Sequence, residues 1–151
     1  MDPDPGSKPL KRFFSPEAEA RIMQAIAEAE SQSSGEIRVH LERHGRGTPM
    51  QRAEQVFLML KIDQTRDRNG VLIYLATEDH RFAILGDSGI DRVVPAFFWE
   101  EARAGLETYF KSGDFEGGIV ELVRRVGAIL ETHFPRKHDD TNELKDEISY
   151  S

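Results

Sequence analysis

The chain has 151 residues, of which 38% are hydrophobic, and this is typical of one domain with a core of its own. It contains no cysteine, so a disulfide framework, a thiolate zinc site and a cysteine nucleophile are excluded. Its 27 acidic and 20 basic residues give a net charge of −7, which disfavours binding to nucleic acids and anionic membranes and favours cationic partners such as metal ions.

Both ends of the chain are polar. We expect a flexible leader at residues 1–12, a folded domain at 13–134 and a disordered polar tail at 135–151. The start of the sequence lacks the apolar stretch of a secretory signal, and no apolar run approaches the roughly 20 residues that cross a bilayer. We therefore expect a soluble, cytoplasmic and monomeric protein.

The first predicted elements are a helix and a strand. Ser15 has the character of an N-cap and Pro16 suits the first helical position, while the polar cluster at 31–35 favours the end of this helix. Residues 36–41 alternate between apolar and polar side chains, which predicts a half-buried strand. We interpret its polar side as a charged face toward solvent that consists of Glu36, Arg38 and His40.

A second helix and two further strands follow. Thr48 opens a capping box, and helical spacing continues over about 49–61. Residues 71–76 form an uninterrupted apolar run, which predicts a central strand. The polar link 77–81 then leads to an apolar segment at 82–85, so the two strands are expected to be adjacent and antiparallel.

Two helices complete the predicted domain. The first covers about 91–110, with Pro95 tolerated only in its first turn; the alternative is that a short turn containing Pro95 precedes the main helix. The second follows a break at 111–114 and ends before Pro135. The resulting order of helices and strands predicts an α/β (α+β) fold. We expect a central mixed sheet of about three or four strands, sandwiched by about four α-helices.

Acidic residues recur where the predicted loops meet strands and helices. Asp67 and Asn69 precede the central strand, Asp87 and Asp91 follow the next strand, and Asp114 opens the last helix. If these loops lie at one end of the sheet, their carboxylates repel each other, and a hard divalent cation with oxygen ligands relieves that repulsion. This pattern predicts a calcium or magnesium site. The alternative is that Asp and Asn stand there as ordinary turn and cap residues.

Two short motifs match known sites only in part. The segment 67–70 resembles the middle of an EF-hand loop, but Thr65 and Ala76 occupy the first and the bidentate ligand positions, which excludes that motif. The segment 86–89 (GDSG) resembles the nucleophile segment of chymotrypsin-like proteases, whose β-barrels do not fit a helix-rich chain. Its glycines instead predict a tight turn with exposed N–H groups before the next helix.

Histidine and aromatic residues give weaker signals. His40 and His44 are close in sequence but have no predictable mutual geometry, so we do not predict a histidine metal site. Aromatic residues concentrate between positions 97 and 110, where helical spacing favours a core over a ligand-stacking surface.

Several segments together resemble the TPM family, which includes the thylakoid lumen phosphatase-like proteins. The resemblance covers about 13–134 and rests on the segments FSPE (14–17), SGEIRV (34–39), NGVLI (69–73), EDHRFAI (78–84) and GDSGID (86–91). It implies a mixed sheet flanked by helices, binding of divalent cations, calcium especially, and acid phosphatase activity. Family members commonly carry a signal peptide and a transmembrane segment, so this chain resembles a stand-alone soluble member.

Three functions follow as hypotheses. The first is a regulatory, non-catalytic domain that binds calcium or magnesium through Asp87 and Asp91, with contributions from Asp67, Asn69 and Asp114. The second is a metal-dependent acid phosphatase in which an arginine balances the phosphate charge, the candidates being Arg66, Arg68 and Arg81. The third is an adaptor that binds a protein partner through Trp99 and the surrounding helix surface.

Overall fold

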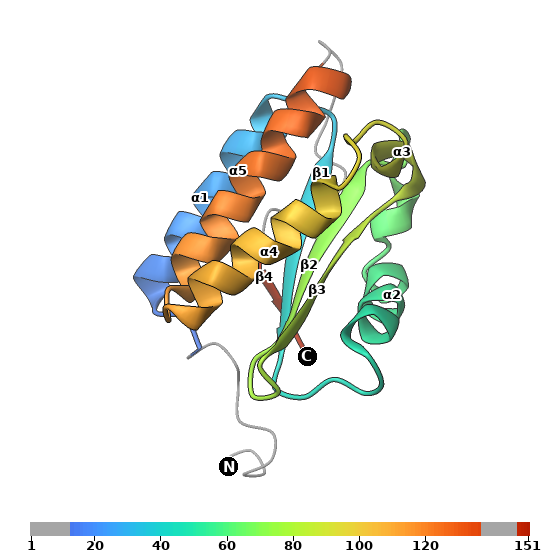
Figure 1. The fold of residues 1–151 in the computed structure, drawn as a ribbon. Coiled ribbons are helices and arrows are strands. Elements are labelled where there is room, and N and C mark those ends of the chain that lie inside the picture. The colour runs from blue at the N-terminus through green and yellow to red at the C-terminus, as the bar shows by residue number, and fades with distance from the viewer. Residues whose placement is uncertain (1–12, 137–147) are drawn as a thin grey trace, which may run out of the picture.

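A computed structural model of the chain describes residues 13–136 and 148–151 (Figure 1). The predicted leader and residues 137–147 of the predicted tail lie outside the described residues.

The described residues form one mixed sheet. Its strands are β1 (Glu36–Glu42), β2 (Gly70–Ala76), β3 (Arg81–Gly86) and β4 (Ile148–Tyr150), in the order β3-β2-β1-β4. Strand β1 is parallel to β2 and β4, whereas β2 and β3 are antiparallel. The predicted mixed sheet and the predicted antiparallel pair are confirmed.

Helices cover both faces of this sheet (Figure 1). On one face lie α1 (Pro16–Ser31), α4 (Phe98–Lys111) and α5 (Phe115–His133), and on the other lie α2 (Pro49–Met59) and the short 3-10 helix η3 (Ile62–Gln64). The predicted α/β sandwich is therefore confirmed. For the region 91–110 the alternative with a short turn before the main helix is the one observed: the short α3 (Ser88–Asp91) ends as the region begins, and α4 starts at Phe98.

The interruption between α3 and α4 has a local cause. Pro95 cannot donate a helical hydrogen bond, and Phe97 has a φ of 66°, in the left-handed region that bulky residues rarely adopt. Phe97 is also 68% exposed, so the core position that helical spacing favoured for the aromatic residues of this segment does not hold for Phe97. Phe98, the next residue, is buried in the core.

The core has two parts, one on each face of the sheet. The larger part joins β1, β2, α1, α4 and α5, and the smaller part joins α2 to Leu72 and Tyr74 of β2. Every residue of β2 is buried, which explains why this strand is an unbroken apolar run.

The polar face of β1 is buried, contrary to the prediction of a solvent face. His40 is only 2% exposed; its Nδ1 lies 2.8 Å from Ser149 Oγ and its Nε2 lies 2.5 Å from Ser151 Oγ. Burial lowers the pKa of the His40 imidazole to about 4. The prediction failed because the polar groups that cover His40 come from the far end of the chain, where the polar tail was expected to be disordered. Residues 148–150 of that tail form β4 instead.

Glu42, the last residue of β1, is buried on the same face of the strand as His40. The Glu42 carboxylate accepts hydrogen bonds from Arg52 Nε (2.8 Å) and Nη2 (3.0 Å), and from the hydroxyl of Tyr74. Burial raises the pKa of Glu42, but these hydrogen bonds act in the opposite sense and the net pKa is lowered. The charge on β1 is therefore stabilised by α2 rather than by water.

Candidate functional site

Two loops meet at one end of the sheet and form what we call the acidic loop site, residues 67–69 and 87–91. Strand pairing brings them together, because Val71 of β2 is opposite Gly86 of β3. The Gly89 N–H donates to the Arg68 carbonyl oxygen at 2.7 Å, and the Asp87 N–H donates to the Gly70 carbonyl oxygen at 2.9 Å. The prediction that the loop before β2 and the loop after β3 lie at one end of the sheet is confirmed.

The glycines of this site act through close packing. A Cβ at position 89 would lie 2.0 Å from the Asp67 carbonyl oxygen, and a Cβ at position 86 would lie 2.5 Å from the Trp99 ring. Neither Gly86 nor Gly89 is among the described glycines with positive φ. The chain does turn directly from β3 into α3, but the Ser88 and Gly89 N–H groups are hydrogen-bonded within the protein, so the predicted exposed N–H groups are wrong. The glycines make room for a neighbouring loop and a ring.

Asp87 is the most enclosed carboxylate of the acidic loop site. Its Oδ2 accepts from Arg68 Nε and its Oδ1 from Arg68 Nη2, both at 2.8 Å, and Oδ1 also accepts from the Ser88 N–H at 2.7 Å. The Asp87 side chain is 6% exposed, whereas that of Arg68 is 51% exposed. The hydrogen bonds with Asp87 raise the pKa of the Arg68 guanidinium. A positive group that is half in solvent therefore occupies the open side of a buried carboxylate.

Asp91 lies one helical turn after Asp87. The Asp91 N–H donates to the Asp87 carbonyl oxygen at 2.9 Å, so the two side chains belong to the same turn of α3. The Asp91 Oδ1 accepts a hydrogen bond of 2.7 Å from Trp99 Nε1. Trp99 is half-buried, and its hydrogen bond orients the Asp91 side chain. The aromatic residue that is well exposed in this region is Phe97.

Asp67 and Asn69 are joined through a serine that was not predicted to take part. Ser34 Oγ donates to Asp67 Oδ2 at 3.1 Å and accepts from Asn69 Nδ2 at 3.2 Å. Asn69 is fully buried, and its Oδ1 has no hydrogen-bond partner among the described residues. A buried amide oxygen without a donor costs about 1–3 kcal/mol. Asn69 therefore brings an unsatisfied oxygen to this end of the sheet.

Asp114 lies elsewhere. Its Oδ1 accepts from the Gly117 N–H at 2.9 Å, which makes it the N-cap of α5. It follows the far end of α4, whose 14 residues span roughly 21 Å at 1.5 Å per residue. Figure 1 shows the α4–α5 connection well away from α3. The structure does not bring Asp114 to the acidic loop site, and its aspartate has the cap role that was the alternative.

The arginines considered for phosphate binding are also separated. Arg66 and Arg68 belong to the loop before β2, and Arg66 Nη2 lies 3.9 Å from Asp67 Oδ2. Arg81 begins β3 at the opposite end of the sheet. Within residues 13–136 and 148–151, no three histidine or acidic side chains are grouped closely enough to form a ready-made metal site.

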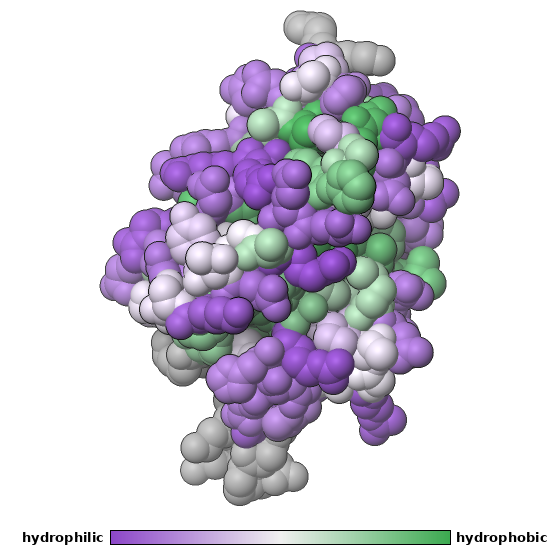
Figure 2. Space-filling model, in the orientation of Figure 1, coloured by the Kyte–Doolittle hydropathy of each residue, from purple (hydrophilic) through white to green (hydrophobic). Residues whose placement is uncertain are grey.

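Apolar residues border the acidic loop site. Figure 2 shows hydrophobic residues gathered over the connection between α3 and α4. Val93 and Val94 are partly buried against the core, and Phe97 projects into solvent.

Comparisons with known proteins identify the family of the chain. The family model of the TPM domain matches residues 10–129. The chain belongs to the TPM domain family. This TPM domain is similar to the BA42 protein of the psychrophilic bacterium Bizionia argentinensis, whose NMR structure aligns with 43% identity and a TM-score of 0.86 over 96% of this chain and 100% of that chain.

A more distant structure shares the fold alone. It is the N-terminal domain of the cg2496 protein from Corynebacterium glutamicum, with 14% identity and a TM-score of 0.64 over 95% of this chain and 97% of that one. No curated protein matches the TPM domain described here. Among its described helices, none is both long enough and apolar enough to cross a membrane.

Proposed function

We propose that this TPM domain binds a divalent cation, calcium or magnesium, at the acidic loop site, and that the ion takes the place of the Arg68 guanidinium. The observation that carries this proposal is the pairing of a buried carboxylate, Asp87, with a positive group that is half in solvent. A buried carboxylate requires a compensating positive charge, and a divalent cation supplies that charge when the half-exposed Arg68 side chain moves into solvent.

The surrounding oxygens support the same proposal. Asp91 lies on the same turn of α3 as Asp87, and both precede the apolar 93–97 segment. Asp67 and Asn69 add a carboxylate and an amide oxygen from the adjacent loop, and the Asn69 Oδ1 has no partner within the part of the chain that the structure describes. Oxygen ligands of this kind are those that calcium and magnesium prefer. The proposed role is regulatory binding rather than turnover.

Calorimetric titration with calcium chloride and with magnesium chloride tests the site. Asp87→Asn and Asp91→Asn should abolish the heat of binding, whereas Arg68→Gln should tighten binding by about two- to fivefold because the competing charge is gone. A gain in affinity cannot result from misfolding. Asp114→Asn is the matched control, since Asp114 lies beyond the far end of α4 and should leave the affinity unchanged.

A second readout reports on the location of the ion. Trp99 is the only tryptophan in the sequence, and its Nε1 donates to Asp91. Calcium at Asp91 should therefore change the Trp99 fluorescence at the same concentrations that produce heat. The proposal is overturned if wild-type protein gives no heat with either ion at millimolar concentration, or if Asp87→Asn and Arg68→Gln both bind like wild type.

A further inference from the structure

The outer side of β1 is covered by β4, which is a strand of only three residues (Figure 1). It pairs with residues 39–41, which are three of the seven residues of β1. The Ser151 N–H extends this pairing, since it donates to the Leu41 carbonyl oxygen at 2.9 Å. Within the described residues, no other strand lies on this side of β1. We call residues 39–41, together with Glu19 of α1, the β1 docking edge.

One face of the segment 148–151 is directed toward α1. Ile148 is 8% exposed and belongs to the larger part of the core. Tyr150, two residues later and therefore on the same face of the strand, donates its hydroxyl hydrogen to Glu19. The Tyr150 side chain nevertheless remains 36% exposed. Ile148 is thus the one side chain of β4 that is buried in the core.

The opposite face of the segment is polar and covers His40. Ser149 Oγ lies 2.8 Å from His40 Nδ1, and Ser151 Oγ lies 2.5 Å from Nε2. Ser149 Oγ also donates to the Val39 carbonyl oxygen at 3.3 Å, so we infer that it accepts from a protonated Nδ1. In the neutral ring Nε2 is then an acceptor for the Ser151 hydroxyl. Two hydroxyls, two residues apart, therefore satisfy both nitrogens of a buried imidazole.

The attachment of β4 is small for a strand. Its backbone pairs, its hydroxyl contacts and the burial of Ile148 must offset the conformational entropy that the segment loses when it is ordered. Segments with so few buried apolar contacts open well before the whole domain unfolds. The eleven residues 137–147 separate β4 from Arg136, and a chain of this length reaches roughly 40 Å when extended. A released β4 can therefore reach the same edge of a neighbouring molecule.

We propose that the β1 docking edge binds β4 of a second copy of this chain as well as its own, so that two molecules exchange residues 148–151. The same contacts form in both cases, and a reciprocal exchange closes as a two-fold dimer. The edge should select an aliphatic residue followed by hydroxyls at the second and fourth positions, because these are the groups that contact the core and His40. This proposal is independent of the cation site, and the two are tested separately.

A synthetic peptide of residues 145–151 (KDEISYS), added to the ¹⁵N-labelled full-length chain and followed by NMR, tests the docking edge. At about millimolar concentration, which is the effective concentration that a short connection provides, the peptide should replace the β4 of the chain itself. The signals of residues 148–151 should then move to the values of an unfolded peptide. Those of residues 36–42 should keep their folded values, since the peptide takes the same place.

Variants of the chain and of the peptide separate this exchange from a general loosening of the fold. Ile148→Ser weakens the attachment of β4 and should lower the peptide concentration for half replacement by about fivefold. A gain in binding cannot result from misfolding. Leu58→Ser is the matched control, because Leu58 is 63% exposed on α2 and should have no effect. A peptide with Ser151→Ala leaves His40 Nε2 without a donor and should bind about fivefold more weakly.

The molecular mass from small-angle X-ray scattering at millimolar concentration tests the second copy. Wild type and Leu58→Ser should contain a dimer, whereas Ile148→Ser should be monomeric. The docking edge is overturned if the peptide at about ten millimolar leaves the signals of 148–151 in place, or if the Ser151→Ala peptide replaces β4 equally well. The exchange between copies is overturned if wild type remains monomeric, or if Ile148→Ser associates as wild type does.

Discussion

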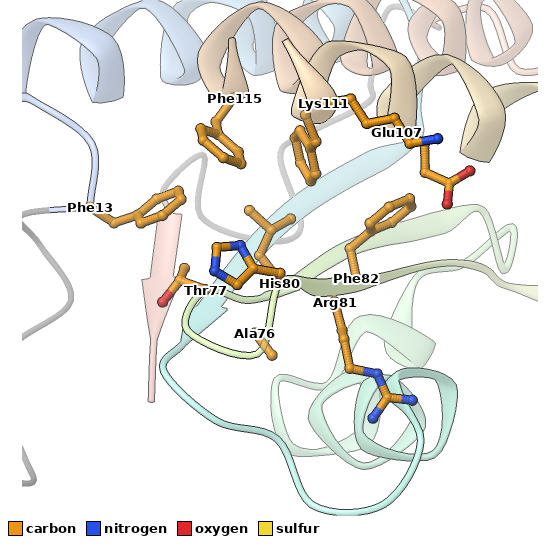
Figure 3. A pocket seen from close by; sticks show the side chains of 11 residues that line it. Phe13, Ala76, Thr77, His80, Arg81, Phe82, Glu107, Lys111 and Phe115 are labelled. Carbon is orange, nitrogen blue, oxygen red and sulfur yellow. The ribbon is translucent and has the colours of Figure 1, made fainter. Parts of the chain in front are cut away.

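The acidic loop site holds its polar groups in pairs, whereas a hollow at the opposite end of the sheet, between the β2–β3 hairpin and the α4–α5 connection, leaves space between aromatic rings (Figure 3). Asp87 is held by Arg68, Asp91 by Trp99 and Asp67 by Ser34, so each carboxylate of the loop site already has a partner. At the hairpin end Phe82, Phe110 and Phe115 contact one another and still border a hollow of about 290 Å³.

The acidic loop site thus offers polar groups but little free space, whereas the hollow offers free space but no distinctive motif. The segment with the recognisable motif, GDSGID, lies where the loops are tightly packed, and a ligand there must displace a side chain. The hollow has no motif, but a ligand can enter it without displacing an ion pair. Binding at the acidic loop site should therefore be selective by charge.

The largest expected effect tests the tight packing of the acidic loop site. Gly89→Ala places a methyl group 2.0 Å from a backbone oxygen that has little freedom to move, and we expect it to lower the free energy of unfolding by about 3 kcal/mol. Gly105→Ala, within α4, meets nothing nearer than 3.6 Å and should be neutral or stabilise by up to about 1 kcal/mol. Urea unfolding followed by circular dichroism compares them, and equal values would contradict the close loop contact.

An intermediate effect should appear in acid, in the half of the sheet near the hairpin. The folded-state pKa of His40 is about 4, below its ordinary value of 6.5, so the folded protein binds this proton less readily than the unfolded chain. The stability linked to His40 should be complete above pH 6.5 and should fall as the pH is lowered toward 4, by about 2–3 kcal/mol.

His40→Gln checks the assignment, because it removes the titrating group and retains a polar side chain. Unfolding free energies of wild type and variant should converge or cross between pH 6.5 and 4, since only wild type loses stability through this group. Parallel curves over that range would show that another residue causes the acid sensitivity.

The smallest effect concerns the Arg68–Asp87 pair. Arg68→Gln leaves the buried Asp87 carboxylate with the Ser88 N–H as its remaining hydrogen-bond donor among the described residues, and we expect the free energy of unfolding in urea to fall by about 1 kcal/mol while cation affinity rises. A much larger loss of stability in Arg68→Gln would mean that the fold requires this ion pair. A cation could then not displace the Arg68 guanidinium from Asp87.

Much of the fold could be predicted from periodicity. The alternation of 36–41, the apolar run of 71–76 and the capping box at Thr48 each identified an element that the structure contains. Strand β4 was missed because its three residues are too few to show a pattern, and they depend on the edge of β1 for their pairing. Pro95 indicated a possible interruption before the main helix, but the left-handed backbone of Phe97 was not predicted, because a bulky aromatic residue gives no sequence signal for that conformation.

The site was predicted in position but not in its contacts. Hairpin connectivity was enough to place residues 67–69 near residues 87–91. The partners of the carboxylates were not predictable, because Ser34 and Trp99 are distant in sequence and Arg68 reaches Asp87 only through the specific geometry of its loop. Asp114 shows why residue type alone does not identify a metal ligand, since an aspartate before a helix can act as its N-cap.

Strand β4 makes the C-terminal residues part of the sheet edge. The Ser151 N–H donates to the Leu41 carbonyl oxygen at 2.9 Å, and the hydroxyls of Ser149 and Ser151 flank the buried His40. An affinity tag or a fused domain placed directly after Ser151 would therefore start beside a buried ionisable group. For work on this TPM domain, a fusion directly after Ser151 is expected to alter the environment of His40.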